Sequence, residues 1–119
     1  MTQTITELLP QNTLRMATGR ILDTGTVSEA FPMTIEVGFQ PRYVKIFNLT
    51  GGSTGLITME HVEGMDDDSG VKTCDEGTSE TGVTLISSLG ITLTANGFII
   101  GLDTDLVVTS EQLTWIAIG

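Results

Sequence analysis

The residues with the clearest chemical potential are a single histidine, His61, and a single cysteine, Cys74. A cysteine nucleophile acts as the thiolate and needs an electropositive setting, whereas Cys74 is followed by Asp75 and Glu76. One histidine and one cysteine are also too few for a structural zinc site. The sequence has no G-x-S-x-G element, phosphate loop or dinucleotide fingerprint. We therefore predict that the chain is not an enzyme and has no catalytic residue and no cofactor.

Two groups of aspartates have the oxygen ligands that a cation would need. Asp66, Asp67 and Asp68 are consecutive, and Asp103 and Asp105 have D-x-D spacing. Calcium takes about six to eight oxygens from spaced positions, whereas the side chains of adjacent aspartates diverge. Aspartates in turns more often bond their own backbone. We predict no metal ligands here, although the sequence leaves cation binding by the acidic segment open.

Aromatic and basic residues are concentrated in the segment 37–52, VGFQPRYVKIFNLTGG. It holds the only tyrosine, two of the four phenylalanines and two of the five basic residues. Its alternation places Tyr43, Lys45 and Phe47 on one face of a strand and Val44 and Ile46 on the other. The second face is typical of a core strand. The first is too apolar for open solvent, so we expect it to meet protein, either the domain's own second layer or a neighbouring subunit.

The C-terminal segment 112–118 alternates in the same way. Leu113, Trp115 and Ala117 share one face, and Thr114, Ile116 and Ile118 share the other. Because both faces are largely apolar, we expect one to face the core and the other to be covered by a subunit. Together with basic residues near the N-terminus, these segments define the interface candidates: Arg15, Arg20, Tyr43, Lys45, Phe47, Trp115, Ile116 and Ile118.

Strands and turns must position these residues, because threonine and glycine are abundant while alanine and lysine are scarce. Asn96-Gly97 between two apolar runs is a strong hairpin signal. The short β-type runs predict an all-β fold, an antiparallel β-sandwich or barrel, jelly-roll-like, with an irregular N-terminal arm. The expected strands are 33–37, 42–49, 55–62, 82–87, 90–94, 97–102 and 112–118.

The chain divides into two unequal parts. Residues 1–24 form an arm, or a short helix or strand, since Pro10 interrupts any early helix. Residues 25–119 form a single β domain. A long acidic loop is expected at about 63–82, with a short strand near 71–73 as an option.

Net charge limits the possible partners. The formal charge is −10, so we expect no nucleic-acid binding, which depends on neutralising phosphates. No apolar run is long enough to span a membrane, and the first ten residues lack the features of a signal peptide. The lone cysteine cannot form an internal disulfide, which suits a reducing compartment.

Three patterns occur in a characteristic order: G-F-x-P-x-x-V-x-I at 38–46, G-F-x-I-G at 97–101, and W-x-A at 115–117. The matching residues are Gly38, Phe39, Pro41, Val44, Ile46, Gly97, Phe98, Ile100, Gly101, Trp115 and Ala117. In this order, over residues 36–119, the chain resembles small β-rich modules of tailed-bacteriophage virion proteins, in particular capsid decoration (cement) proteins.

The resemblance implies a structural protein that is made in the host cytoplasm and ends on the capsid surface of the virion. Its implied partner is the major capsid protein, and its implied state is a homo-oligomer, with a trimer favoured. The alternative is a tail-fibre or tail-tip domain that binds a host glycan through Tyr43, Trp115 or the acidic loop. The chain has no repetitive trimerising stem of the kind a fibre tip needs.

Overall fold

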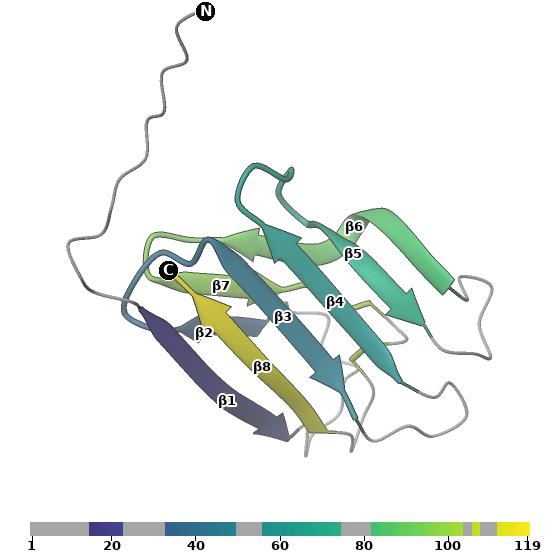
Figure 1. Cartoon of the computed structure of the whole chain (residues 1–119), viewed down its shortest axis with the longest axis horizontal. Helices are drawn as coiled ribbons and strands as arrows, with labels where there is room; N and C mark the ends of the chain where they lie inside the picture. The colour runs from purple at the N-terminus through teal and green to yellow at the C-terminus, as the bar shows by residue number, and fades with distance from the viewer. Residues whose placement is uncertain (1–14, 23–32, 50–55, 75–81, 104–105, 108–111) are drawn as a thin grey trace, which may run out of the picture.

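The described part of the chain is built from β-strands joined by turns, and Figure 1 shows their arrangement. A computed structural model describes residues 15–22, 33–49, 56–74, 82–103, 106–107 and 112–119. Those residues include no helix that could cross a bilayer. The strands are β1 (Met16–Leu22), β2 (Met33–Glu36), β3 (Tyr43–Asn48), β4 (Ile57–Val62), β5 (Ser69–Cys74), β6 (Gly82–Leu93), β7 (Gly97–Ile100) and β8 (Gln112–Ile118).

All strand pairs are antiparallel and join one eight-stranded sheet of order β1-β8-β3-β4-β5-β6-β7-β2. Strands β3 to β7 form a meander, because each pairs with the next strand along the chain. The pairs β1–β8 and β2–β7 instead join segments that are far apart in sequence. The all-β antiparallel fold that the sequence predicts is therefore confirmed.

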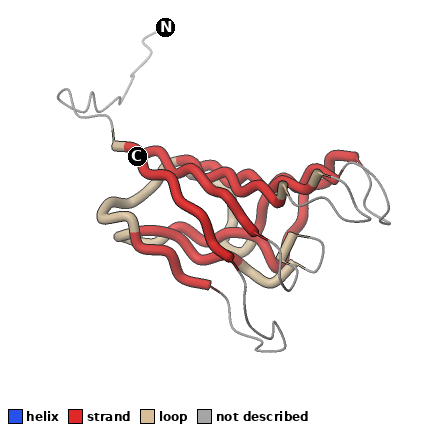
Figure 2. The backbone as a smooth tube through the Cα atoms, turned by 90° about the horizontal axis from the view of Figure 1, so that it is seen from below, coloured by secondary structure: helices blue, strands red, loops and turns tan. Residues whose placement is uncertain are grey.

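The sheet curls into a half-barrel with two layers, which Figure 2 shows from the side. Strand β6 connects the layers. Its first half pairs with β5, and its last residues pair with β7. Between these halves Ile86 pairs with Gly70 whereas Ile91 pairs with Ser69, so the segment 87–90 bulges out of the ladder. A bulge of this kind bends a strand and allows it to leave one layer for the other.

A clamp centred on Asp68 holds the bulge in place. Asp68 has a left-handed backbone, with φ 64°. Its Oδ2 accepts a hydrogen bond from Leu89 N, and its carbonyl accepts one from Gly90 N. Gly90 is required here because a Cβ at this position would collide with the backbone of Ser69. Part of the aspartate run at 66–68 therefore stabilises the strand crossing.

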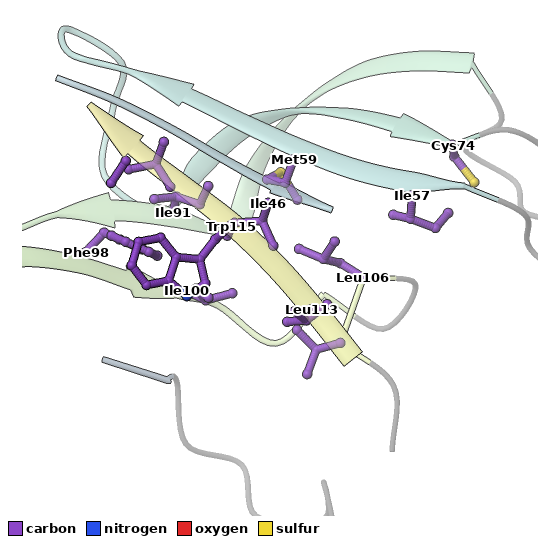
Figure 3. Packing of buried hydrophobic residues seen from close by; sticks show 13 residues of the cluster. Ile46, Ile57, Met59, Cys74, Ile91, Phe98, Ile100, Leu106, Leu113 and Trp115 are labelled. Atoms are coloured by element: carbon purple, nitrogen blue, oxygen red, sulfur yellow. The ribbon is translucent and has the colours of Figure 1, made fainter. Parts of the chain in front are cut away.

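The core lies between the two layers, where the inward side chains of each strand meet (Figure 3). Val44 and Ile46 of β3 are fully buried, as their alternation predicts. Trp115 on β8 packs edge-to-face with Phe98 on β7, with 5.3 Å between the ring centroids. This contact ties the two layers together. The apolar core residues are Val44, Ile46, Ile57, Met59, Cys74, Ile91, Phe98, Ile100, Leu106, Val107, Leu113, Trp115 and Ala117.

One strand boundary differs from the sequence prediction, and two segments follow options that the sequence left open. The two runs expected at 82–87 and 90–94 form one strand, β6, because the bulge lets the chain continue through Ser88-Leu89-Gly90. The acidic loop expected at 63–82 is divided by β5, which pairs on both sides. Within the N-terminal region 1–24, residues 16–22 form strand β1 on β8. Residues 1–14 and 23–24 of that region lie outside the described part.

Candidate functional site

His61 and Cys74, which were considered as a possible nucleophilic pair, lie apart in the structure. Both are buried in the interior. Cys74 pairs with Ile57, four residues before His61 on β4, which separates the two by roughly 13 Å along the strand. The His61 Nδ1 lies 2.9 Å from the Ser69 carbonyl oxygen, so this ring bonds to the β5 backbone. The geometry does not form a Cys–His pair.

A buried ion pair, which the sequence prediction missed, occupies the interior. Lys72 on β5 is 1% exposed, and its Nζ lies 3.1 Å from both carboxylate oxygens of Asp103. Asp103 Oδ1 also accepts a hydrogen bond from Leu106 N, and Asn48 Nδ2 donates one to the Leu106 carbonyl. The network attaches Asp103 and Leu106 to strands β3 and β5. Its role is structural, because all of these groups bond to one another inside the core.

Cation sites are not formed by the described acids. Asp103, one half of the D-x-D spacing, is engaged with Lys72, and Asp105 lies outside the described residues. Asp68 is used in the clamp on β6, and the Asp66 carbonyl accepts a hydrogen bond from Ser69 Oγ. Across the described ranges, no three histidine, cysteine or acidic side chains are grouped as metal ligands.

Most of the interface candidates gather on one surface, which we call the outer face. It is the side of β1, β8 and β3 that points away from the core. Register brings these side chains next to one another across the strands. Each residue of β8 lies between one of β1 and one of β3, in three rows: Met16–Ile118–Tyr43, Thr18–Ile116–Lys45 and Arg20–Thr114–Phe47. In Figure 1 these three strands lie side by side in the front layer.

Polar contacts on the outer face are local and well formed. Tyr43 donates its phenolic hydrogen to Glu60 Oε2 on β4 at 2.6 Å. The Lys45 ammonium lies 5.0 Å from the centre of the Phe47 ring, within the range of a cation–π contact. The outer face is therefore a half-buried surface of aromatic, aliphatic and basic side chains, a composition common in protein interfaces.

Charge is distributed unevenly over this surface. Arg20 on β1 and Lys45 on β3 lie on the outer face, and Arg15 and Arg42 are exposed just before the same two strands. The fifth basic residue of the chain, Lys72, is buried in the ion pair. The outer face and its border thus carry every exposed basic side chain of a protein whose net charge is −10.

Trp115 is the exception among the candidates, and its inclusion as an interface residue is wrong. It is 8% exposed and points into the core with Leu113 and Ala117, while Ile116 and Ile118 point outward. Gly19 on β1 makes room for it, because a Cβ there would lie 2.5 Å from the indole ring. The sequence showed two apolar faces on this strand but not which one was inside.

Tyr43 offers a direct test of the outer face, since it is the only tyrosine. Burial raises its pKa from 10.0 to about 12, with further contributions from the hydrogen bond and the charge of Glu60. Because the folded pKa is the higher one, the associated stability is fully present below pH 10 and is lost as pH rises through 12. We expect tyrosinate absorbance to titrate near pH 12 in the folded protein. Glu60→Gln should lower the midpoint, and a wild-type midpoint near 10 would contradict this assignment.

A second apolar region lies on the first half of β6, which no candidate residue covered. Val83 is 72% exposed and Leu85 is 71% exposed. A shallow hollow of about 300 Å³ lies beside Leu85, between β6 and the β4–β5 turn, and Met65 and Ile86 also line it. The alternation in GVTLIS predicts the strand, but local sequence could not show that its outward residues stay uncovered.

The chain matches no protein-family model, no curated protein and no solved structure at a significant level. The outer face and the chemistry of its residues are therefore the basis for a function.

Proposed function

We propose that this chain is a structural virion protein that uses the outer face of its sheet to dock on the head of a tailed bacteriophage, as a capsid decoration protein. The observation that supports docking is the gathering of Arg20, Tyr43, Lys45, Ile116 and Ile118 on one continuous sheet surface. The sequence resemblance to virion modules supports the choice of partner, the major capsid protein.

The chemistry of the outer face suits a protein partner with an acidic surface. Aromatic and aliphatic side chains provide area that is released from water on docking, and such patches on folded proteins mark interaction sites. The basic side chains at the same place would be complementary to acidic groups, which favours association and orientation. A stable interface needs roughly 800 Å² from each partner, an area for which a three-stranded surface is a reasonable scaffold. Binding of this kind requires no cofactor.

The glycan-binding alternative has less support. A sugar platform needs exposed aromatic rings, but Trp115 faces the core and the Tyr43 hydroxyl already donates to Glu60. Part of the acidic segment is strand β5, and its Asp68 is used within the fold. A glycan array probed with the folded protein would revive this alternative if it gave a specific signal.

The test is binding of the purified chain to phage heads that lack it, measured by cosedimentation and electron microscopy. We expect the wild type to bind and Ile116→Asp to bind at least about tenfold more weakly, because a charge would be placed in the centre of the apolar contact. Lys45→Glu should also weaken binding, and added salt should weaken wild-type binding.

Thr34→Glu is the matched control, since Thr34 is exposed on β2 in the other layer. It should bind like the wild type. Absence of the chain from virions, together with no binding to empty shells, would overturn the proposal.

A further inference from the structure

Among the described residues, the first half of β6 is paired along one backbone edge only. Residues 82–86 pair with β5 on one side, while β7 pairs only with residues 91–93, beyond the bulge. Within the described residues nothing pairs with the other side of 82–86. Figure 1 shows this half of β6 at the border of the sheet, beside β5 and away from β7. In an antiparallel strand, alternate residues form hydrogen bonds with the same neighbouring strand. The N–H and C=O groups of the other residues in 82–86 therefore point away from β5, in the plane of the sheet.

This edge lacks the usual protection against pairing. Exposed sheet edges in natural proteins commonly carry lysine, proline or other charged residues that prevent another strand from adding. Strand β6 has no charged residue and no proline along its length. Its outward side chains Val83 and Leu85 are instead the most exposed of the large hydrophobic residues in the described structure.

We propose that a second copy of this chain pairs with this edge, antiparallel and about a two-fold axis at Thr84. A two-fold axis perpendicular to the sheet keeps outward side chains on the same face, so Val83 and Leu85 must oppose outward residues of the partner. With the axis at Thr84, Val83 lies opposite Leu85 of the second copy, and Leu85 lies opposite its Val83. The two β5–β6 pairs then become one continuous sheet with a four-residue apolar cluster on it.

Charge and register favour a second copy over a different partner. Copies with a net charge of −10 repel one another, so they should meet where neither contributes charge, and β6 is such a strand. If the axis lay at Val83 or at Leu85, that residue would face its own copy in the partner. The other exposed side chain would then face neither Val83 nor Leu85. The Thr84 register is the one in which both are covered. This contact is separate from the outer face and does not depend on the proposed function.

Pairing along this edge specifies the oligomeric state. A two-fold contact uses the same surface on both copies and gives a dimer, whereas the resemblance to decoration proteins implies a trimer. Light scattering or sedimentation of the purified chain separates the two. We expect the mass of a dimer at high protein concentration, and a mass that is monomeric throughout, or trimeric, would overturn the proposal.

Leu85→Lys is the decisive variant. It places a charge at the edge, opposite Val83 of the other copy, and we expect it to halve the measured mass. Because Leu85 is exposed in the single chain, the circular dichroism spectrum should be unchanged, and the melting temperature should equal that of the wild type at concentrations where the wild type is monomeric. Val62→Lys is the matched control, an exposed apolar residue at the end of β4, and it should remain dimeric. A Leu85→Lys protein that stays dimeric would show that another surface is used.

A cysteine pair tests the register independently. A residue on a two-fold axis faces its own copy, with a Cβ separation of roughly 5 Å, close to that in disulfides. Thr84→Cys should therefore form an intermolecular disulfide on mild oxidation, whereas Ser87→Cys should not. Native Cys74 is buried and serves as an internal background. Efficient cross-linking through Ser87→Cys but not Thr84→Cys would contradict the proposed axis.

Discussion

Replacement of Lys72 by methionine is expected to lower the free energy of unfolding by about 3–5 kcal/mol. The substitution keeps much of the side-chain volume but leaves the Asp103 carboxylate inside the protein without its cationic partner. Removing one member of a buried ion pair is costly because the remaining charge has lost its solvation and its counter-charge. For a domain of this size the loss is a large share of the total stability.

The double variant Lys72→Met/Asp103→Asn is the control that separates charge from packing. The asparagine side chain keeps an oxygen that can accept the hydrogen bond from Leu106 N, while it removes the buried negative charge. We expect the double variant to recover most of the stability lost by Lys72→Met. Urea unfolding followed by circular dichroism measures all three proteins, and a Lys72→Met loss below about 1 kcal/mol would show that water reaches the pair.

Trp115→Ala is expected to destabilise the protein by about 3–5 kcal/mol, as large-to-small changes of buried aromatics do. The indole fills the space above Gly19 and meets the ring of Phe98 from the other layer. Its removal would leave a cavity at the contact that joins β7 to β8. The neighbouring backbone belongs to paired strands and can collapse only in part, so the cavity cost should persist.

Trp115→Phe should lose less than Trp115→Ala, because it keeps an aromatic ring that can meet Phe98. Leu49→Ala is a surface control, since Leu49 is largely exposed, and its effect should stay within about 0.5 kcal/mol. Denaturation must be followed by circular dichroism, because Trp115 is the only tryptophan. Similar midpoints for Trp115→Ala and the wild type would contradict the core position of this residue.

Local alternation in the sequence was sufficient to predict the fold class and most of the outer face. Val44 and Ile46 point inward and Tyr43, Lys45 and Phe47 point outward, because successive side chains of a strand lie on opposite faces of the sheet. The same alternation places Trp115 and Ile116 on opposite faces of β8, but it does not show which face is buried. The buried face of β8 is the one that the second layer covers, where β7 places Phe98 against Trp115.

The remaining features depend on contacts between distant segments. Strand β1 is not evident from its own sequence, because its partner β8 lies almost at the other end of the chain. From the sequence alone Lys72 is expected at the surface, as most lysines are. Its burial is explained only by the ion pair with Asp103, which the fold brings next to it. The continuity of β6 through Leu89 rests on the Asp68 clamp, which joins the β4–β5 turn to the bulge. None of these pairings has a signature within a window of a few residues.

The position of β8 has a consequence for how the protein is made. This strand occupies the place between β1 and β3, although both are synthesised long before it. Until β8 emerges from the ribosome, β1 has no partner and β3 has one bare edge. Pairings between distant segments are slow to form because a long loop must close first. The meander from β3 to β7 can assemble during translation, but the outer face stays incomplete until β8 joins β1 to β3. During that interval the nascent chain has unpaired strand edges and is most in need of protection from aggregation.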